Sequence, residues 1–378
     1  MRVRSRISAR SVALLFLIAA CAAAKVNVPT LKQTFKGDFV IGAAINEAQI
    51  TGQDQRGDAL LAAQFNSISP ENVLKWENIH PKAGQYNFDL ADKYVAFGQK
   101  HHMFIVGHNL VWHSQVPDWV FHDEKGNLLD RDALLARMKD HISTIVGRYK
   151  GKIQSWDVVN EALNEDGTLR QSLWYKIIGP DYIEKAFQFA HEADPQVQLF
   201  YNDYNLENEP KRNGAIALVK KLQADGIPIT GVGIQGHDHL DWPTAEQEDA
   251  TISAFAALGI KVAISELDID VLPRRGGPTA DVSLKIEQDT ALNPYASRLP
   301  DSVQQQLATR YADLFRVYLK HRDTVERVTF WGVTDGDSWL NNWPVQGRTN
   351  YPLLFDRKGQ PKPAYNAVLA VASEAKNH

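Results

Sequence analysis

Short apolar runs recur along the chain and alternate with longer segments of helical periodicity. The apolar runs are rich in β-branched residues and cover 39–45, 65–69, 103–111, 153–159, 198–201, 231–235, 261–265 and 328–333. Between them, apolar residues repeat with the period of an α-helix at 90–101, 131–149, 181–192, 210–224, 245–258 and 303–321. Eight strands that alternate with helices indicate parallel β-α-β units, because parallel neighbours need a long crossover connection.

Two architectures use such units. An open doubly wound sheet usually has a glycine-rich turn after its first strand, whereas here the first run ends in Ile45, Asn46 and Glu47. A closed barrel of eight strands fits the pattern better, and chains of this size fall within its range. We therefore predict the α/β class, with a single-domain (β/α)8 TIM barrel over residues 25–378.

Polar and aromatic residues follow the carboxyl ends of the predicted strands. In strand order they are Glu71 and Asn72, His108 to His113, Asn160 and Glu161, Asn202 to Asn205, Gln235 to His237, Glu266 to Asp268, and Trp331 within the eighth strand. A strand buried in a barrel is expected to stay apolar until it reaches solvent. Because active sites of such barrels lie at this end, these residues predict one shared site.

Residues 1–24 differ from the rest of the chain and predict an export signal. Four arginines precede a short apolar run, which is too short to span a bilayer and is followed by small residues. Cleavage after 22–24 would release a soluble protein that begins near Lys25. Alternatively, 18–21 resembles a bacterial lipobox, in which Cys21 would carry a lipid anchor. Both interpretations predict an exported protein, periplasmic or extracellular, and the second predicts an outer-membrane lipoprotein.

Composition narrows the function classes. The chain is 44% hydrophobic and 23% charged, which is typical of a soluble globular protein and excludes a disordered or multi-span membrane chain. The net charge is −4 and no dense basic cluster occurs beyond the extreme N-terminus, so we expect no nucleic-acid partner. Cys21 is the single cysteine, which excludes an intrachain disulfide.

Two glutamates stand directly after hydrophobic strands. Glu161 ends the sequence Trp-Asp-Val-Val-Asn-Glu, and Glu266 lies in Ile-Ser-Glu-Leu-Asp. A barrel would bring both carboxyl groups to the same mouth. Glycoside hydrolysis needs such a pair, one group to protonate the leaving oxygen and one to attack or to activate water.

Other motifs predict no cofactor and no metal. Residues 231–236 spell G-x-G-x-x-G, but the glycines lie within a predicted strand and no helix opens after them, so nucleotide binding is not expected. These glycines more plausibly leave room for packing or for a ligand. Neither H-E-x-x-H nor a His/Cys cluster with zinc spacing occurs. Trp331, Trp339 and Trp343, with Asn341, Asn342 and Arg348 nearby, instead predict a wall for sugar rings.

At these motifs the chain resembles family-10 glycoside hydrolases, the retaining endo-β-1,4-xylanases. The resemblance begins near residue 35 and covers nearly the whole predicted barrel. Its matching segments run in family order at 69–76, 107–119, 156–161, 201–205, 233–237, 259–269, 330–335 and 338–339. It implies that xylan and xylo-oligosaccharides are the ligands; no protein partner is implied.

The resemblance also implies roles for single residues. Glu161 would be the general acid/base and Glu266 the nucleophile of a double displacement. Asn160 would bind the sugar 2-hydroxyl, and Asp268 would orient His237 beside the nucleophile. The implied sugar contacts are Gln235, His108, Trp112, Trp331 and Trp339 around the reacting sugar, Glu71, Asn72 and Lys75 on the next xylose, and Tyr204 with Asn205 toward the leaving group.

The clearest departure from the family pattern is the long segment 270–302, which we expect to shape the distal sugar sites. Two other functions stay open. The same carboxylates would serve a related β-1,4-glycanase that prefers cellulose or aryl cellobiosides. The chain could also be a polysaccharide-binding lipoprotein without catalysis, although both glutamates are present with their orienting neighbours.

Overall fold

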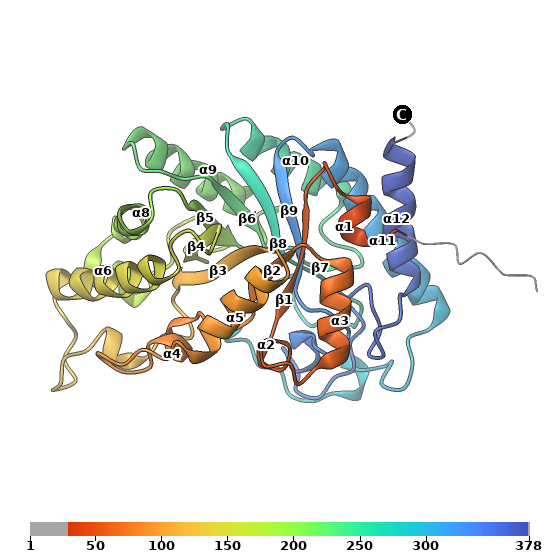
Figure 1. Ribbon diagram of the computed structural model, residues 1–378, viewed down its shortest axis with the longest axis horizontal. Helices are drawn as coiled ribbons and strands as arrows, with labels where there is room; N and C mark the ends of the chain where they lie inside the picture. Colours follow the sequence, from red (N-terminus) through yellow and green to blue (C-terminus); the bar gives the residue numbers. More distant parts are fainter. Residues whose placement is uncertain (1–28, 377–378) are drawn as a thin grey trace, which may run out of the picture.

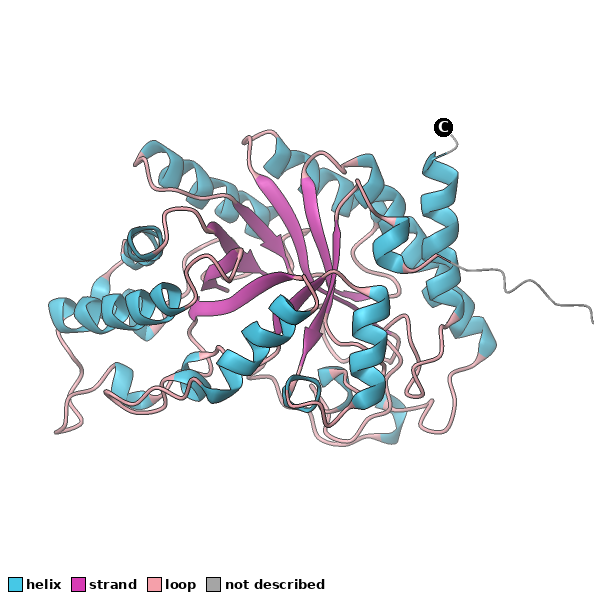
Figure 2. Ribbon diagram, in the orientation of Figure 1, coloured by secondary structure: helices cyan, strands magenta, loops and turns pink. Residues whose placement is uncertain are grey.

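The computed structural model describes residues 29–376. Eight parallel strands form a closed barrel, because each pairs with its neighbours, β6 pairs with β8, and β1 pairs with β9. Helices surround the strands (Figures 1 and 2). This confirms the predicted (β/α)8 barrel. Its strands are β1 (Val40–Ile45), β2 (Ser67–Pro70), β3 (Phe104–Val111), β4 (Ser155–Asn160), β5 (Gln198–Asp203), β6 (Gly231–Ile234), β8 (Lys261–Asp270) and β9 (Val325–Phe330).

The six helices that periodicity predicts are all present. They are α5 (Asp89–Lys100), α6 (Arg131–Arg148), α8 (Tyr182–Ala193), α9 (Glu209–Ala224), α10 (Ala245–Ala256) and α11 (Asp301–Lys320). Two further long helices are α3 (Gln55–Gln64) and α12 (Pro363–Lys376). Helix α3 buries only Gly57 and Leu61, so its apolar stripe is too weak to stand out in the sequence.

Short helices complete the loops between these elements. They are α1 (Leu31–Thr34), α2 (Glu47–Ile50), α4 (Trp76–Ile79), α7 (Leu173–Ile178) and three 3₁₀ turns, η1 (Asp118–Val120), η2 (Thr290–Leu292) and η3 (Trp339–Asn341). Helices α1 and α12 come from opposite ends of the described chain and contact each other, as do α11 and α12 (Figure 1). The two ends of the chain are thereby held together on one side of the barrel.

The eighth barrel strand differs from its prediction. It was expected over 328–333, but β9 begins at Val325 and ends at Phe330. Glu326 and Arg327 hid its start, because charged residues are unusual in a buried strand. Trp331 therefore follows the strand instead of lying in it, and Gly332 turns the chain there with φ +136°.

A ninth, three-residue strand, β7 (His237–His239), lies beyond the end of β6. It pairs with the last residues of β8, so that His237 lies opposite Asp268. The long strand β8 runs past the end of β6 and carries Glu266 and Asp268 beyond Ile264, the last residue that it pairs with β6. This small ladder fixes the side chains of one wall of the barrel mouth.

Glycines in the barrel are required by close packing. A Cβ on Gly107 would lie 2.1 Å from the Trp156 ring, and one on Gly233 would lie 2.2 Å from Asn202 Oδ1. Gly231 and Gly233 lie within β6 itself, and no helix follows them, which agrees with packing instead of nucleotide binding. The glycine at 233 leaves the space in which Asn202 reaches toward the barrel mouth.

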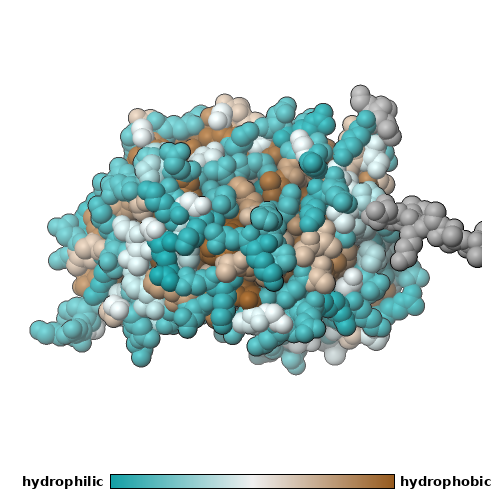
Figure 3. Space-filling view, viewed as in Figure 1, coloured by the Kyte–Doolittle hydropathy of each residue, from teal (hydrophilic) through white to brown (hydrophobic). Residues whose placement is uncertain are grey.

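The face of the molecule shown in Figure 3 is mostly hydrophilic, with hydrophobic residues scattered over it. Among residues 29–376, Leu128 is the one large hydrophobic side chain that is mostly exposed. Over the same residues, none of the helices has both the length and the apolarity needed to cross a membrane. The predicted export signal at 1–24 lies outside the described residues.

Candidate active site

A cavity of about 140 Å³ lies where the carboxyl ends of the barrel strands meet. It brings together almost all of the residues that the sequence predicts for the site. Its walls are formed by Glu71, Asn72, Lys75, His108, Trp112, Gln115, Asn160, Glu161, Gln235, His237, Glu266, Ala280, Val282, Trp331 and Trp339. Of the residues to which the family resemblance gives a role, Tyr204, Asn205 and Asp268 lie outside this lining.

Glu161 lies immediately after β4, on a turn of the backbone with φ +56°. A non-glycine residue held in this region costs about 1–3 kcal/mol, so surrounding structure must fix it. Its carboxyl accepts hydrogen bonds from Trp112 Nε1 at 2.8 Å and Gln235 Nε2 at 3.1 Å. Burial raises the pKa of Glu161 to about 7, and the negative charges of Asp203 and Glu266 add to the rise. At neutral pH this group can therefore hold a proton.

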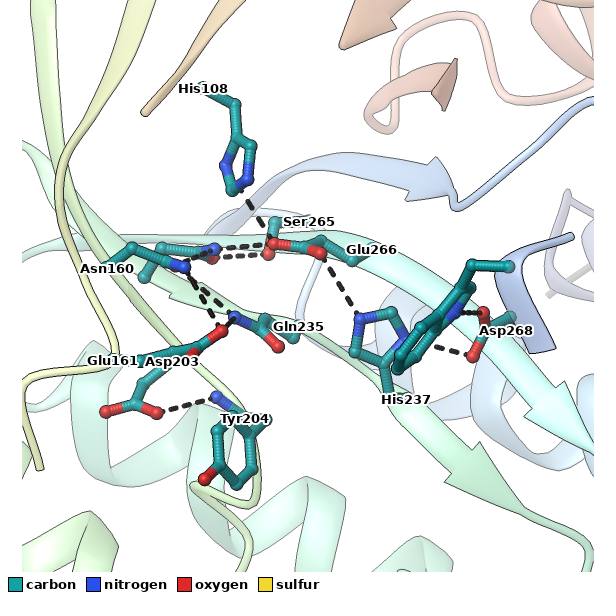
Figure 4. A network of polar contacts seen from close by, with 12 residues as sticks. His108, Asn160, Glu161, Asp203, Tyr204, Gln235, His237, Ser265, Glu266 and Asp268 are labelled. Atoms are coloured by element: carbon teal, nitrogen blue, oxygen red, sulfur yellow. Dashed lines mark hydrogen bonds and ion pairs between the residues drawn. The ribbon is translucent and has the colours of Figure 1, made fainter. Parts of the chain in front are cut away.

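Glu266 is equally buried but is held in the opposite state. Asn202 Nδ2 donates to Oε1 at 2.7 Å, and His237 Nε2 contacts Oε2 at 3.2 Å. His108 Nδ1 lies 4.0 Å from Oε1. Burial alone would raise the pKa of Glu266, but His108, His237 and Asn202 together outweigh it and hold the pKa below its ordinary value. Figure 4 shows these contacts around the carboxylate.

His237 is itself held by a second carboxylate. Its Nδ1 lies 3.0 Å from Asp268 Oδ1, and Asp268 also accepts from Trp339 Nε1 at 2.8 Å (Figure 4). Burial alone would lower the pKa of His237, but Asp268 and then Glu266 raise it to about 10. The imidazole is therefore protonated at neutral pH and donates to both carboxylates, which keeps Glu266 ionised.

Two asparagines connect the two glutamates. Asn160 Nδ2 donates to Glu161 Oε1 at 3.1 Å, and Asn202 Nδ2 reaches both Asn160 Oδ1 at 2.8 Å and Glu266 Oε1. Ser265 Oγ donates to Asn202 Oδ1 at 2.6 Å, which orients the amide. The sequence places Asn202 in the polar run at the barrel mouth but gives it no role, and it does not identify Ser265. The polar run 202–205 was the available signal, since its first residue points into the barrel.

Lys75, Asn72 and Gln115 form a hydrogen-bonded cluster in the cavity wall. Lys75 Nζ donates to Asn72 Oδ1 at 3.0 Å and to Gln115 Oε1 at 2.8 Å, and it lies 5.1 Å from the centre of the Trp112 ring. Burial lowers the pKa of Lys75 and raises that of Glu71. The sequence did not identify Gln115, because no local motif marks a glutamine that approaches from forty residues away.

Tyr204 and Asn205 are not brought into the cavity lining. Tyr204 lies beside it, with its hydroxyl accepting from Arg170 Nη2 at 3.2 Å. Asn205 donates to Glu165 Oε2 at 3.1 Å and to the carbonyl of Pro278 at 2.9 Å. The two residues therefore connect the loops at the edge of the site.

Only two of the three clustered tryptophans line the cavity. Trp331 and Trp339 do so, whereas Trp343 stacks on Trp339 with ring centres 4.4 Å apart. Arg348 is buried in an ion pair with Asp270 at 3.3 Å, because a charge in the loop interior needs a partner. The predicted wall is thus smaller than expected, and Arg348 holds the loop instead of facing sugar.

The long segment after β8 reaches the cavity. Ala280 and Val282 contribute to its lining, and the carbonyl of Asp281 accepts from Trp343 Nε1 at 3.1 Å. Asn341 and Asn342, expected beside the sugar wall, instead form hydrogen bonds within their own loop.

Across residues 29–376 no group of three or more His, Cys, Asp or Glu side chains is arranged to hold a metal ion.

Comparison with known proteins gives consistent matches over the barrel. The model of the family described as glycosyl hydrolase family 10 matches residues 30–371. Endo-1,4-beta-xylanase A of Xylanibacter ruminicola is 44% identical over 351 residues, covering 92% of this chain and 95% of the relative. The endo-1,4-beta-xylanase of Geobacillus stearothermophilus is 43% identical, covering 91% and 99%. A GH10 endoxylanase structure from a sugarcane soil metagenome is 50% identical, with a TM-score of 0.88 and coverage of 90% and 99%.

Proposed function

The chain belongs to glycosyl hydrolase family 10, and on that premise we propose that it cleaves internal β-1,4-xylosidic bonds of xylan by a retaining double displacement between Glu161 and Glu266. The assignment of roles rests on the different surroundings of the two glutamates in one cavity, which raise the pKa of Glu161 and lower that of Glu266. Two carboxyl groups with separated pKa values supply one acid and one nucleophile at the same pH.

In the first step the Glu266 carboxylate attacks the anomeric carbon while the bond from that carbon to the leaving oxygen breaks. Glu161 transfers its proton to this oxygen, so the shortened chain departs as a neutral alcohol. The sugar is left as an ester on Glu266. Trp112 and Gln235, which donate to Glu161, hold its carboxyl toward the cavity.

In the second step Glu161 is ionised and takes a proton from a water molecule. The water oxygen attacks the anomeric carbon, and the ester bond breaks to release the Glu266 carboxylate. His237 donates to that carboxylate and stabilises it as a leaving group. Two inversions at one carbon give overall retention.

The remaining cavity residues would bind the sugar chain. Asn160 lies between the glutamates, where a 2-hydroxyl hydrogen bond would strengthen in the transition state. His108, Gln235, Trp112, Trp331 and Trp339 would surround the reacting sugar, while Glu71, Asn72 and Lys75 would bind the next one toward the non-reducing end. Tyr204 and Asn205, at the edge, would face the leaving-group side.

We also propose that the protein is exported, from the composition of residues 1–24. Cys21 either carries a lipid that anchors the protein to a membrane or is removed with the signal.

The first experiment is to incubate the protein with glucuronoxylan and with carboxymethyl-cellulose and to size the early products. Mixed xylo-oligosaccharides from xylan, with little product from cellulose, support the proposed endo-xylanase. Comparable release from cellulose would instead support a broader β-1,4-glycanase, and free xylose alone would mean attack at chain ends. The absence of product from either polymer would support a binding protein and contradict catalysis. Glu161→Gln serves as the matched inactive control, because it keeps the shape of the side chain without its acid.

A further inference from the structure

A buried ion pair lies directly behind Glu161, outside the cavity lining. Asp203, the last residue of β5, and Lys211, on the first turns of α9, are both fully buried, with Lys211 Nζ 3.0 Å from Asp203 Oδ1. Burying two charges is costly unless geometry is good and further hydrogen bonds are made. No step of the mechanism above uses either residue, so their place beside the acid/base needs another explanation.

Burial raises the pKa of Asp203, but Lys211 and several hydrogen-bond donors oppose that rise and stabilise the ionised form. Three donors face the carboxylate, namely Lys211 Nζ, the hydroxyl of Tyr201 and the backbone N–H of Tyr204, the last at 2.9 Å. A carboxylate that accepts several hydrogen bonds is stabilised in the charged state. Lys211 also reaches Glu165 Oε1 at 3.0 Å, and the Asp203 charge helps to keep the pKa of this lysine above its ordinary value despite burial.

The same residues hold the backbone turn that carries Glu161. The Tyr201 hydroxyl donates to Asp203 and accepts from the backbone N–H of Ala162 at 3.2 Å. The N–H of Glu161 donates to the carbonyl of Asn202 at 2.8 Å. Both bonds tie the two residues of this turn to β5, immediately beside Asp203. They supply the restraint that a left-handed φ at Glu161 requires.

We propose that Asp203, paired with Lys211, is a positioning residue for Glu161 that fixes its backbone turn and sets the pH at which it loses its proton. This inference rests on the proposed role of Glu161 as acid/base. The negative charge of Asp203 disfavours a second negative charge on the nearby Glu161 carboxyl. Figure 4 shows Asp203 beside Glu161, on the side away from Glu266.

Other titratable groups also interact with Glu161, and the test must separate their effects from that of Asp203. All of them stay unchanged in the variants below. They are Glu266 within β8, Lys75 after β2, Arg170 after β4 and the neutral Tyr204 after β5.

The experiment compares pH profiles of kcat/KM on xylo-oligosaccharides for the wild type and Asp203→Asn. The asparagine keeps the size of the side chain and an acceptor for Tyr201 but removes the charge. Glu161 then ionises more easily, so the basic limb should move to lower pH by about one unit. An aryl xylobioside with a nitrophenolate-type leaving group needs no proton in this step, so its kcat/KM should not show the shift.

Asp194→Asn is the matched control, because Asp194 is also buried and accepts backbone hydrogen bonds but lies before β5, at the far end of the barrel. The basic limb of the kcat/KM profile of Asp194→Asn should coincide with that of the wild type. A folded Asp203→Asn protein whose basic limb stays in place overturns the inference. If Glu161→Gln keeps its activity on xylan, the acid/base assignment itself fails, which is a different result.

If Asp203→Asn does not fold, Tyr201→Phe tests the first part of the proposal, that this group of residues fixes the backbone turn of Glu161. It removes one hydroxyl, which accepts from Ala162, and keeps the buried ring. We expect kcat on xylan to fall about tenfold with KM within twofold, because the turn loosens without loss of sugar contacts. A kcat within twofold of the wild type in a stable Tyr201→Phe protein would contradict the role.

Discussion

In an unfolded chain Glu161 and Glu266 would ionise at nearly the same pH, and the difference between them arises from single neighbours. Glu161 is faced by Asp203 and accepts from neutral donors, Trp112 and Gln235. Glu266 instead faces two imidazoles, His108 at 4.0 Å and the protonated His237 at 3.2 Å. Desolvation acts on both carboxyls, so the sign of the nearest charge decides which one keeps its proton at pH 7.

Glu161→Ala should slow the hydrolysis of a substrate more strongly, the poorer its leaving group is. Loss of about 1,000-fold or more is expected on xylan, whereas an activated aryl xylobioside should form the glycosyl-enzyme almost normally, because its leaving group needs no acid. Azide should then accelerate turnover and give a glycosyl azide of retained configuration, since it attacks the ester on Glu266 from the space left by the carboxyl. Equal losses on both substrates would argue against an acid role.

Glu266→Ala should abolish turnover on every substrate without unfolding the protein. We expect a loss of at least about 1,000-fold in kcat, because no covalent intermediate can form. Circular dichroism and the thermal midpoint should show that the barrel is intact. Near-normal activity, or an inverted azide adduct from Glu161→Ala, would be incompatible with the proposed nucleophile.

At the scale of elements, the barrel depends on strands that approach closely. Gly107 on β3 faces the Trp156 ring on β4, and the two strands pair at these residues. The sequence marks Gly107 only as a glycine in a strand. A glycine is needed there because the ring of a tryptophan forty-nine positions later occupies the space of a side chain, and no local pattern connects the two positions.

Gly107→Ala should destabilise the protein by about 1–3 kcal/mol or more, since its Cβ would lie 2.1 Å from the Trp156 ring and force an overpacked core. Gly147→Ala on α6 is the matched control, because a Cβ there meets nothing within 4 Å and a helical alanine should stabilise by roughly 0.5–1 kcal/mol. Urea unfolding of both variants measures the difference. A Gly107→Ala protein as stable as the wild type would show that Trp156 can move aside.

Strand β7 and the long segment after β8 show what element-level prediction misses. The apolar runs predicted all eight barrel strands but not β7, because three residues with two histidines form no apolar run. Yet β7 sets His237 opposite Asp268. Likewise, the sequence marked the segment after β8 as long, but only the fold places Ala280 and Val282 in the cavity wall.

At the scale of the whole molecule, the remaining question is where the protein acts. The proposed export would bring the protein to xylan outside the cell. Cys21→Ser distinguishes the two signal interpretations. If the lipobox is used, the variant should move from the membrane fraction to the soluble fraction, as measured by fractionation and immunoblotting. A variant that fractionates like the wild type would contradict lipidation of Cys21.

The sequence by itself determined the order of the strands, the barrel and the two glutamates, because each is encoded locally: continuous apolar runs, helical stripes, and carboxylates directly after those runs. Tertiary structure alone decided which residues meet. In the structure Asn202 contacts Glu266 and Gln115 contacts Lys75. Arg348 forms an ion pair instead of part of the expected sugar wall, and Asp203 lies next to Glu161. The physical reason is that burial and neighbouring charge set the chemistry of a side chain, and both depend on residues distant in the sequence.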